Sequence, residues 1–181
     1  MIFECTDMKS PVGTLAIAVA DTRLIALCFD GIWEHRVRSL ERRFPGSSFP
    51  SVRDPAGVVM RLGGYFGGDL DALDPIEVET FGTPFQQSVW AELRRIPVGE
   101  TRSYGEIARS IGQPLAVRAV GTANGANPVA IVVPCHRVIG SDGSLTGFGG
   151  GLPNKKWLLE HEGAQLRVFP SEPAERRRSA A

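Results

Sequence analysis

Cysteine is scarce in this chain, which has only Cys5, Cys28 and Cys135, and no two of them have Cys-x-x-Cys spacing. An odd count without that spacing argues against a disulfide framework and against a tetrahedral metal site. His35 adds one further metal-binding side chain to the first half, which is too few for a closed site. We therefore expect no metal and no cofactor, and the free thiols predict a reducing, cytoplasmic location.

Long apolar runs and an excess of charge are absent as well. No run approaches the roughly 18 apolar residues of a membrane helix, and the first residues lack the pattern of a signal peptide, so we expect no membrane association. The 20 basic and 20 acidic residues balance. Residues 1–80 hold 8 Lys and Arg against 12 Asp and Glu, whereas residues 81–165 hold 8 against 6. A polyanion is therefore expected to meet the C-terminal half.

Residues 1–80 are predicted to form a small scaffold domain of sheet and helices. Leu15, Ile17 and Val19 alternate with small residues, which is typical of a half-buried strand, and residues 21–23 then form a hairpin turn. Pro45 and Gly67 follow segments with helical spacing of apolar residues. The expected elements are strands over 14–20 and 24–29, helices over 33–44 and 56–66, and an edge strand over 76–80.

Residues 81–165 are predicted to form a helical domain, which makes the fold α/β (α+β) as a whole. Thr83 precedes Pro84 and Gln86 in the pattern of a helix N-cap, and Ser103 with Glu106 repeats it. The expected helices cover about 84–96, 103–111, 116–124 and 154–161. The second and third are spaced as a helix-turn-helix of winged-helix-like type, although a helical hairpin without DNA fits equally well. Residues 166–181, rich in Pro, Ala and Arg, are predicted to be disordered.

The helix expected over 116–124 has an unusual surface for a DNA-reading element. Its one charge is Arg118, and most of its other side chains are small, including Ala119, Thr122 and Ala123. Helices that read the major groove usually present several long polar side chains. A smooth helix with a single arginine suits close approach to a narrow groove, but it also suits tight packing against neighbouring helices. The residues alone leave both interpretations open.

The segment 131–140 places a thiol next to groups that can move protons. Ile131 to Val133 read as a buried strand that Pro134 should end, and Cys135, His136 and Arg137 follow at once. An isolated buried cysteine is more often inert. Here the polar neighbours need partners inside a buried segment, which favours a functional cysteine.

Several motifs in the second half resemble the O6-methylguanine-DNA methyltransferase family, also called methylated-DNA–protein-cysteine methyltransferases. The resemblance covers residues 83–163 almost without gaps, and residues 1–80 share only the Ser-Pro-Val-Gly turn at 10–13. The motifs are FQQSVW at 85–90, SYG at 103–105, RAVG at 118–121, NP at 127–128, PCHRV at 134–138, GGGL at 149–152 and HEG at 161–163.

The resemblance implies a repair protein that uses its own cysteine as the acceptor. The family transfers an alkyl group from O6 of guanine, and less readily from O4 of thymine, to a cysteine that matches Cys135. A histidine matching His136 is linked to the thiol through a water, and a glutamate matching Glu162 holds that histidine. Asn127 matches an asparagine that braces the turn beside the active site. Because nothing regenerates the thioether, each molecule is expected to react once.

The resemblance also implies duplex DNA with alkylated bases as the partner of a monomeric protein. The family rotates the damaged nucleotide out of the duplex. Arg118 matches the arginine that fills the vacated space, and Tyr104 matches a tyrosine that helps to extrude the base and donates a proton to the leaving guanine. Backbone groups of Cys135 and Val138 match contacts to the exocyclic amine of guanine. The helix bearing Arg118 would lie in the minor groove with Ala119, Thr122 and Ala123.

One departure from the family pattern affects the expected substrate. Where some members have a serine before the glycines, this chain has Gly149 after Phe148. A backbone N–H could replace the missing hydroxyl, and the smaller residue would leave a roomier pocket, so we expect tolerance of alkyl groups larger than methyl. A non-catalytic reader of alkylated bases, a thiol hydrolase and a transcription regulator are the alternatives. Cys135, the stability of a thioether and the lack of a cysteine-rich zinc domain argue against them.

Overall fold

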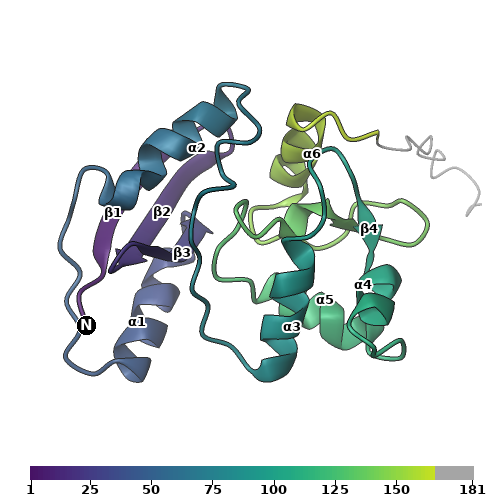
Figure 1. Cartoon of the computed structure of the whole chain (residues 1–181), viewed down its shortest axis with the longest axis horizontal. Helices are drawn as coiled ribbons and strands as arrows, with labels where there is room; N and C mark the ends of the chain where they lie inside the picture. Colours follow the sequence, from purple (N-terminus) through teal and green to yellow (C-terminus); the bar gives the residue numbers. More distant parts are fainter. Residues whose placement is uncertain (166–181) are drawn as a thin grey trace, which may run out of the picture.

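The computed structural model describes residues 1–165 and has a mixed α/β architecture (Figure 1). The expectation of disorder for residues 166–181 lies outside the described residues. A three-stranded sheet with helices α1 and α2 lies on the left of Figure 1, and helices α3 to α6 lie on the right. Among the described residues, no helix combines the length and apolarity needed to cross a membrane.

The sheet is antiparallel and has the order β1-β2-β3. It consists of β1 (Glu4–Ser10), β2 (Gly13–Ala20) and β3 (Arg23–Phe29), so the hairpin predicted for the last two strands is confirmed. Strand β1 was not predicted, because its sequence ECTDMKS is mostly polar and carries no clear alternation. It pairs along its whole length with β2 across the turn at Pro11, from Glu4 opposite Val19 to Ser10 opposite Gly13.

The sheet buries both of its faces, which explains why its central strand is apolar throughout. Leu15, Ile17 and Val19 of β2 join the larger core with α2 (Val58–Phe66) and with the helices of the second half. Ala18 and Ala20 face the other side and pack with Leu40 of α1 (Trp33–Arg43). These results confirm the predicted helices, although α2 begins later than expected, after a 3-10 turn at Pro55–Gly57.

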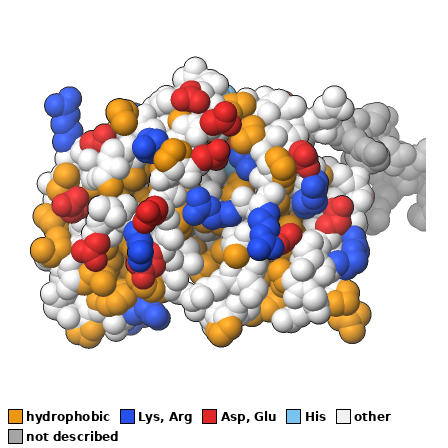
Figure 2. Space-filling view, viewed as in Figure 1, with side chains coloured by type: hydrophobic (Ala, Val, Ile, Leu, Met, Phe, Trp, Pro, Cys, Tyr) orange, Lys and Arg blue, Asp and Glu red, His pale blue; other side chains and the backbone are white. Residues whose placement is uncertain are grey.

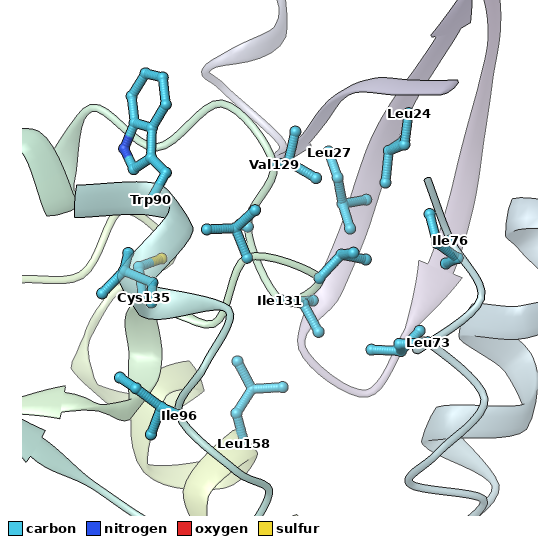
Figure 3. Packing of buried hydrophobic residues seen from close by; sticks show 14 of the residues in the cluster. Leu24, Leu27, Leu73, Ile76, Trp90, Ile96, Val129, Ile131, Cys135 and Leu158 are labelled. Carbon is cyan, nitrogen blue, oxygen red and sulfur yellow. The ribbon is translucent and has the colours of Figure 1, made fainter. Parts of the chain in front are cut away.

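The outer edge of β3 is covered by two segments from later in the chain. Leu24 exchanges backbone hydrogen bonds with Glu77 and Glu79, at 2.8 and 3.1 Å, around a single bridge to Val78. The expected edge strand over 76–80 is therefore reduced to one bridge. Leu27 donates to the carbonyl of Pro128 at 3.0 Å and accepts from Ala130 at 2.8 Å, and its side chain lies beside Val129 (Figure 3). The segment that leads to Cys135 is thus attached to the sheet.

The helices of the second half are α3 (Pro84–Leu93), α4 (Tyr104–Ser110), α5 (Val117–Gly125) and α6 (Leu152–His161). Both predicted capping boxes are present: Thr83 caps α3 with Gln86, and Ser103 caps α4 with Glu106. Helix α3 ends three residues before the predicted Ile96. A short parallel pair of strands, β4 (Arg102–Ser103) and β5 (Val138–Ile139), joins the start of α4 to the chain just after Cys135.

The prediction of a strand over residues 131–133 is wrong, although the prediction that these residues are buried is confirmed. Ile131 has a φ of 71°, in the left-handed region that β-branched residues rarely occupy, so the chain turns there instead of extending. The residues around it are hydrogen-bonded locally, since the N–H of Val132 donates to the carbonyl of Ala130 and that of Val133 to the carbonyl of Val129, both at 2.9 Å. The continuous apolar run therefore reflects burial on all sides, and periodicity cannot distinguish this from a strand.

Candidate active site

Cys135 opens a buried 3-10 turn, Cys135–Arg137, that follows directly on the turns at 129–133. Asn127 braces this segment: its side-chain amide donates to the carbonyl of Val133 at 2.8 Å, and its Oδ1 accepts from the backbone N–H of Val129 at 3.0 Å. Asn124 of α5 adds a longer bond of 3.4 Å to the carbonyl of Cys135. The thiol is therefore held by a tightly bonded backbone instead of by a flexible loop.

The environment of the Cys135 thiol exerts opposing effects on its pKa. Burial raises the pKa, because a thiolate is poorly solvated inside the protein. A hydrogen bond from the Asn127 side chain and the charge of Lys155 act in the opposite direction. Burial has the larger effect and the pKa of Cys135 is raised, so thiolate formation depends on these neighbours and on a base that takes the proton.

His136 and Glu162 are in direct contact, as the family resemblance implied. The Nε2 atom of His136 lies 3.0 Å from Oε1 of Glu162, and both side chains are fully buried. A carboxylate accepts only, so Nε2 carries the proton and Nδ1 keeps its lone pair. Nδ1 has no hydrogen-bond partner among residues 1–165. Burial lowers the pKa of His136 more than Glu162 raises it, which leaves a neutral imidazole able to accept a proton.

Glu162 lies at the C-terminal end of α6 and is the centre of a larger network. Arg137 binds it through two nitrogens, with Nε to Oε2 and Nη2 to Oε1 both at 2.8 Å. Tyr65 of α2 donates its hydroxyl to Oε1, also at 2.8 Å. Burial alone would raise the pKa of Glu162, but the hydrogen bonds from His136 and Arg137 outweigh it and the pKa is lowered. The carboxylate is therefore charged at neutral pH.

Lys155 of α6 is a buried cation that sequence reasoning missed. Its ammonium donates to the carbonyls of Val138 and Thr146, both at 2.6 Å. Burial lowers its pKa to about 8, while Cys135 raises it. A signal was available, because Lys155 lies three and four residues before Leu158 and Leu159 and so shares the apolar face of the helix. A lysine in such a position needs partners inside the protein.

A small cavity of about 60 Å³ adjoins the thiol and is lined by both halves of the chain. Asn124, Asn127 and Ala130 line it next to Cys135, and the loop 147–149 closes one side. The first half contributes Leu27, Cys28, Phe29, Ile32 and Arg36. Gly149 lies at this wall, where an added Cβ would meet Ile32 at an ordinary 3.7 Å. Among residues 1–165, no group of three or more His, Cys, Asp and Glu side chains is placed to hold a metal ion.

Comparison with known proteins identifies proteins that are similar to this chain. Residues 84–164 match the family model described as "6-O-methylguanine DNA methyltransferase, DNA binding domain". The methylated-DNA–protein-cysteine methyltransferase of Mycolicibacterium paratuberculosis is 46% identical over 175 residues, which are 93% of this chain and 99% of that protein. The chain belongs to the methylated-DNA–protein-cysteine methyltransferase family. The protein of the same name from Salmonella typhimurium is 51% identical over 71% of this chain and 75% of its own length.

Solved structures of methyltransferases of this family agree with the fold. The O6-methylguanine methyltransferase of Mycobacterium tuberculosis superimposes with a TM-score of 0.76 at 44% identity, covering 89% of this chain and 93% of that one. A structure described as Mycobacterium tuberculosis OGT in complex with DNA gives a TM-score of 0.74 at 42% identity, with coverages of 90% and 93%. The likeness therefore extends through the first half, where the sequence motifs were weak.

The remaining residues singled out through the methyltransferase family lie on two sides of the site. Tyr104 opens α4 and accepts a hydrogen bond from Thr146 at 3.3 Å, beside the loop that closes the cavity. The side chain of Val138 is buried, and its carbonyl accepts from Lys155. Arg118 is exposed on α5, together with Ala119 and Thr122.

Ala123 does not share that exposed face. Its side chain is buried, and its carbonyl accepts a hydrogen bond from the indole nitrogen of Trp90 at 2.8 Å. The prediction that Ala123 contacts DNA is therefore corrected. A helix has only one exposed stripe, and the residue five positions after Arg118 lies outside it.

Proposed function

We propose that this protein repairs alkylated DNA by moving an alkyl group from O6 of guanine to the sulfur of Cys135. The observation that carries the proposal is the distance of 3.0 Å between His136 Nε2 and Glu162 Oε1. His136 lies in the turn that begins with Cys135, so this pair adjoins the thiol. Family membership supports it, since relatives that match nearly the whole chain are named methylated-DNA–protein-cysteine methyltransferases. O4-alkylthymine is the expected poorer substrate.

The groups in the site have matching roles in this reaction. The lone pair on Nδ1 of His136 receives the thiol proton through a bridging water, and Glu162 keeps the imidazole in the required tautomer. The thiolate attacks the alkyl carbon, a new S–C bond forms, and the C–O6 bond breaks. The electron pair goes to guanine, and the hydroxyl of Tyr104 donates a proton to the leaving base. Since S-alkylcysteine is a stable thioether, each molecule reacts once.

Duplex DNA is the proposed partner, and the second half of the chain is its binding domain. A relative whose structure is described as a complex with DNA supports this assignment. We assign α4 and α5 to a winged-helix-like helix-turn-helix and place the exposed face of Arg118, Ala119 and Thr122 in the minor groove. Rotating the damaged nucleotide out of the stack costs a few kcal/mol, and the guanidinium of Arg118 would fill the vacated space.

The division into domains is part of the same proposal. Residues 1–80 would form the N-terminal domain and residues 81–165 the DNA-binding and acceptor domain, in a protein that acts as a cytoplasmic monomer. Charges of both signs are interspersed on the face shown in Figure 2, so this face has no continuous basic surface for DNA.

Intact-protein mass spectrometry tests the proposal. The protein is mixed with a duplex that carries one O6-methylguanine, and we expect one methyl group per chain, mapped to the Cys135 peptide. Cys135→Ala should accept none while still binding the duplex. Cys28→Ala is the matched control, because Cys28 lines the same cavity and should be dispensable. A protein that binds the damaged duplex tightly without gaining a methyl group would be a reader of lesions instead.

A further inference from the structure

Among residues 1–165, Arg36 is the only charged side chain that lines the cavity beside Cys135. It lies on α1, in the half of the chain to which the sequence assigned no chemistry. Its Nε is buried and has no hydrogen-bond partner among residues 1–165. A buried donor without an acceptor costs free energy, which an acceptor group on a ligand would recover.

No carboxylate among residues 1–165 lines the cavity beside Arg36 or pairs with it. On its other side Arg36 borders a second cavity of about 340 Å³, whose lining adds Arg42 and Arg43 and again no carboxylate. Burial lowers the pKa of the Arg36 guanidinium, with Cys28 acting in the opposite direction, yet arginine stays protonated in proteins. The part of the cavity wall that Arg36 forms with Cys28 is therefore cationic.

We propose that Arg36 adapts the site to O6-alkyl groups that end in a negative charge, of which carboxymethyl is the simplest. This inference rests on the proposed alkyl transfer and names its preferred substrate class. A carboxylate one carbon beyond the reacting carbon has the planar, two-oxygen geometry that a guanidinium binds best. Gly149 lines the same cavity, and its missing side chain leaves room there, since an added Cβ would meet Ile32 only at an ordinary 3.7 Å.

Charge also favours a cation in the cavity lining for this substrate. A thiolate and a carboxylate repel each other at short distance, and more strongly in a buried site than in water. Lys155 already acts on the thiol, but its ammonium is bound to the carbonyls of Val138 and Thr146 and does not line the cavity. Arg36 offsets this repulsion in the bound state and in the transition state.

The reaction balances without any added reagent. The sulfur of Cys135 attacks the methylene carbon, so that an S–CH2 bond forms and the CH2–O6 bond breaks. The electron pair of that bond goes to guanine, which takes up one proton in place of the one lost by the thiol. The carboxylate is unchanged and remains next to Arg36, and the product is S-carboxymethylcysteine.

Single-turnover kinetics with matched lesions test the proposal. Duplexes carrying O6-carboxymethylguanine are compared with duplexes carrying the neutral amide of nearly equal shape, O6-carbamoylmethylguanine. We expect the wild type to react faster with the acid, by about tenfold or more. Arg36→Gln should remove most of that ratio and Arg36→Lys should keep part of it. Arg38→Gln is the control, since Arg38 is exposed on the same helix and pairs with Glu34 at 3.5 Å.

The outcomes separate this inference from the function on which it rests. If Arg36→Gln slows the acid and the amide equally, Arg36 serves DNA binding or the fold, and the inference is overturned. The same holds if the wild type shows no preference for the acid. Melting temperatures show whether Arg36→Gln folds. If it does not, the ratio of the acid rate to the amide rate is compared between the wild type and Arg36→Lys. If the wild type itself transfers no methyl group from O6-methylguanine, the proposed function is overturned instead.

Discussion

Cys28 and Cys135 line one cavity from opposite halves of the chain, and both are buried. For Cys28, burial raises the pKa to about 11, and the charges of Asp7 and Asp30 act in the same direction, although Arg36 opposes them. For Cys135, burial again raises the pKa, but Asn127 and Lys155 oppose it and a neutral histidine follows in the same turn. Residue type and burial are thus shared, and the neighbouring groups determine which thiol reacts.

The two halves of the chain also contribute different groups to the site. The first half is a sheet with helices, and its helix α2 and strand β3 pack into a core that continues to Leu158 of α6 (Figure 3). It contributes no proposed acid, base or nucleophile, yet it supplies Tyr65 to Glu162 and Arg36 to the cavity. The scaffold predicted for residues 1–80 is therefore also part of the wall and the support of the site.

Glu162→Gln should have the largest effect, because Glu162 binds both His136, the proposed base, and Tyr65 of the first half. An amide cannot balance the buried charge of Arg137, so we expect a loss of about 3–5 kcal/mol in the free energy of unfolding. Transfer should slow by about 100-fold or more, because His136 loses its carboxylate. Chemical denaturation and single-turnover rates measure the two effects. Glu160→Gln is the matched control, since Glu160 is exposed on the same helix.

The pH dependence of stability provides an independent check on Glu162. Its pKa is lowered in the folded protein, so the stability it contributes is complete above the unfolded value of about 4.3 and is lost as the pH falls from there toward the folded pKa. The wild type should therefore lose stability in acid more steeply than Glu162→Gln. Parallel pH profiles for the two proteins would contradict the assignment of a buried, charged carboxylate.

Lys155→Met should have the next largest effect, on the thiol rather than on the base. Removal of the buried cation leaves burial less opposed, so the pKa of Cys135 should rise, and each unit of that rise costs about tenfold in thiolate at neutral pH. The rate of Cys135 alkylation by iodoacetamide, followed against pH, measures the shift. Lys155→Arg retains the charge and should restore part of the rate, and Lys156→Met on the exposed face should change nothing.

A purely structural role for Lys155 would give a different result. Its two hydrogen bonds hold the carbonyls of Val138 and Thr146, so its loss also weakens the contact between α6 and the loop. In that case Lys155→Met would melt at a lower temperature with an unchanged pH profile for the thiol. A shifted profile in the folded protein is expected only from the charge.

The features that the sequence predicted correctly are local ones. The N-cap of α3 at Thr83 and that of α4 at Ser103 depend on residues three positions apart, so the printed sequence contains all the information they need. The hairpin of β2 and β3 follows in the same way from alternation around a short turn. The pairing of His136 with Glu162 was expected only from the family resemblance, since no spacing rule joins residues 26 positions apart.

The features that the sequence did not predict depend on tertiary contacts. Ile131 adopts a left-handed conformation because Asn127 and the edge of β3 fix the chain on both sides of it. Local propensity would have favoured an extended strand there. Arg36 lies 99 residues before the thiol whose cavity it lines, and its sequence context resembles that of any exposed helical arginine. Only the assembled fold identifies it.

Tyr65→Phe should have the smallest of these effects, and it tests whether the first half of the chain adjusts the chemistry of the second. The change removes a hydroxyl that donates to Oε1 of Glu162 at 2.8 Å, while the ring keeps its packing against Phe66 and His161. Hydrogen bonds to charged groups contribute about 1.5–3 kcal/mol, and we expect a stability loss at the lower end because Arg137 and His136 remain as donors.

The informative measurement for Tyr65→Phe is the pH profile of transfer. Oε1 accepts from both Tyr65 and His136, so the loss of one donor should make it a stronger acceptor for the other. The pKa of His136 should then rise, and the acidic limb of the profile should move toward higher pH with only a few-fold change in the maximal rate. A lower melting temperature with an unmoved profile would mean that Tyr65 only packs the two halves together. A moved profile would mean that a residue of the first half adjusts the base that activates the thiol.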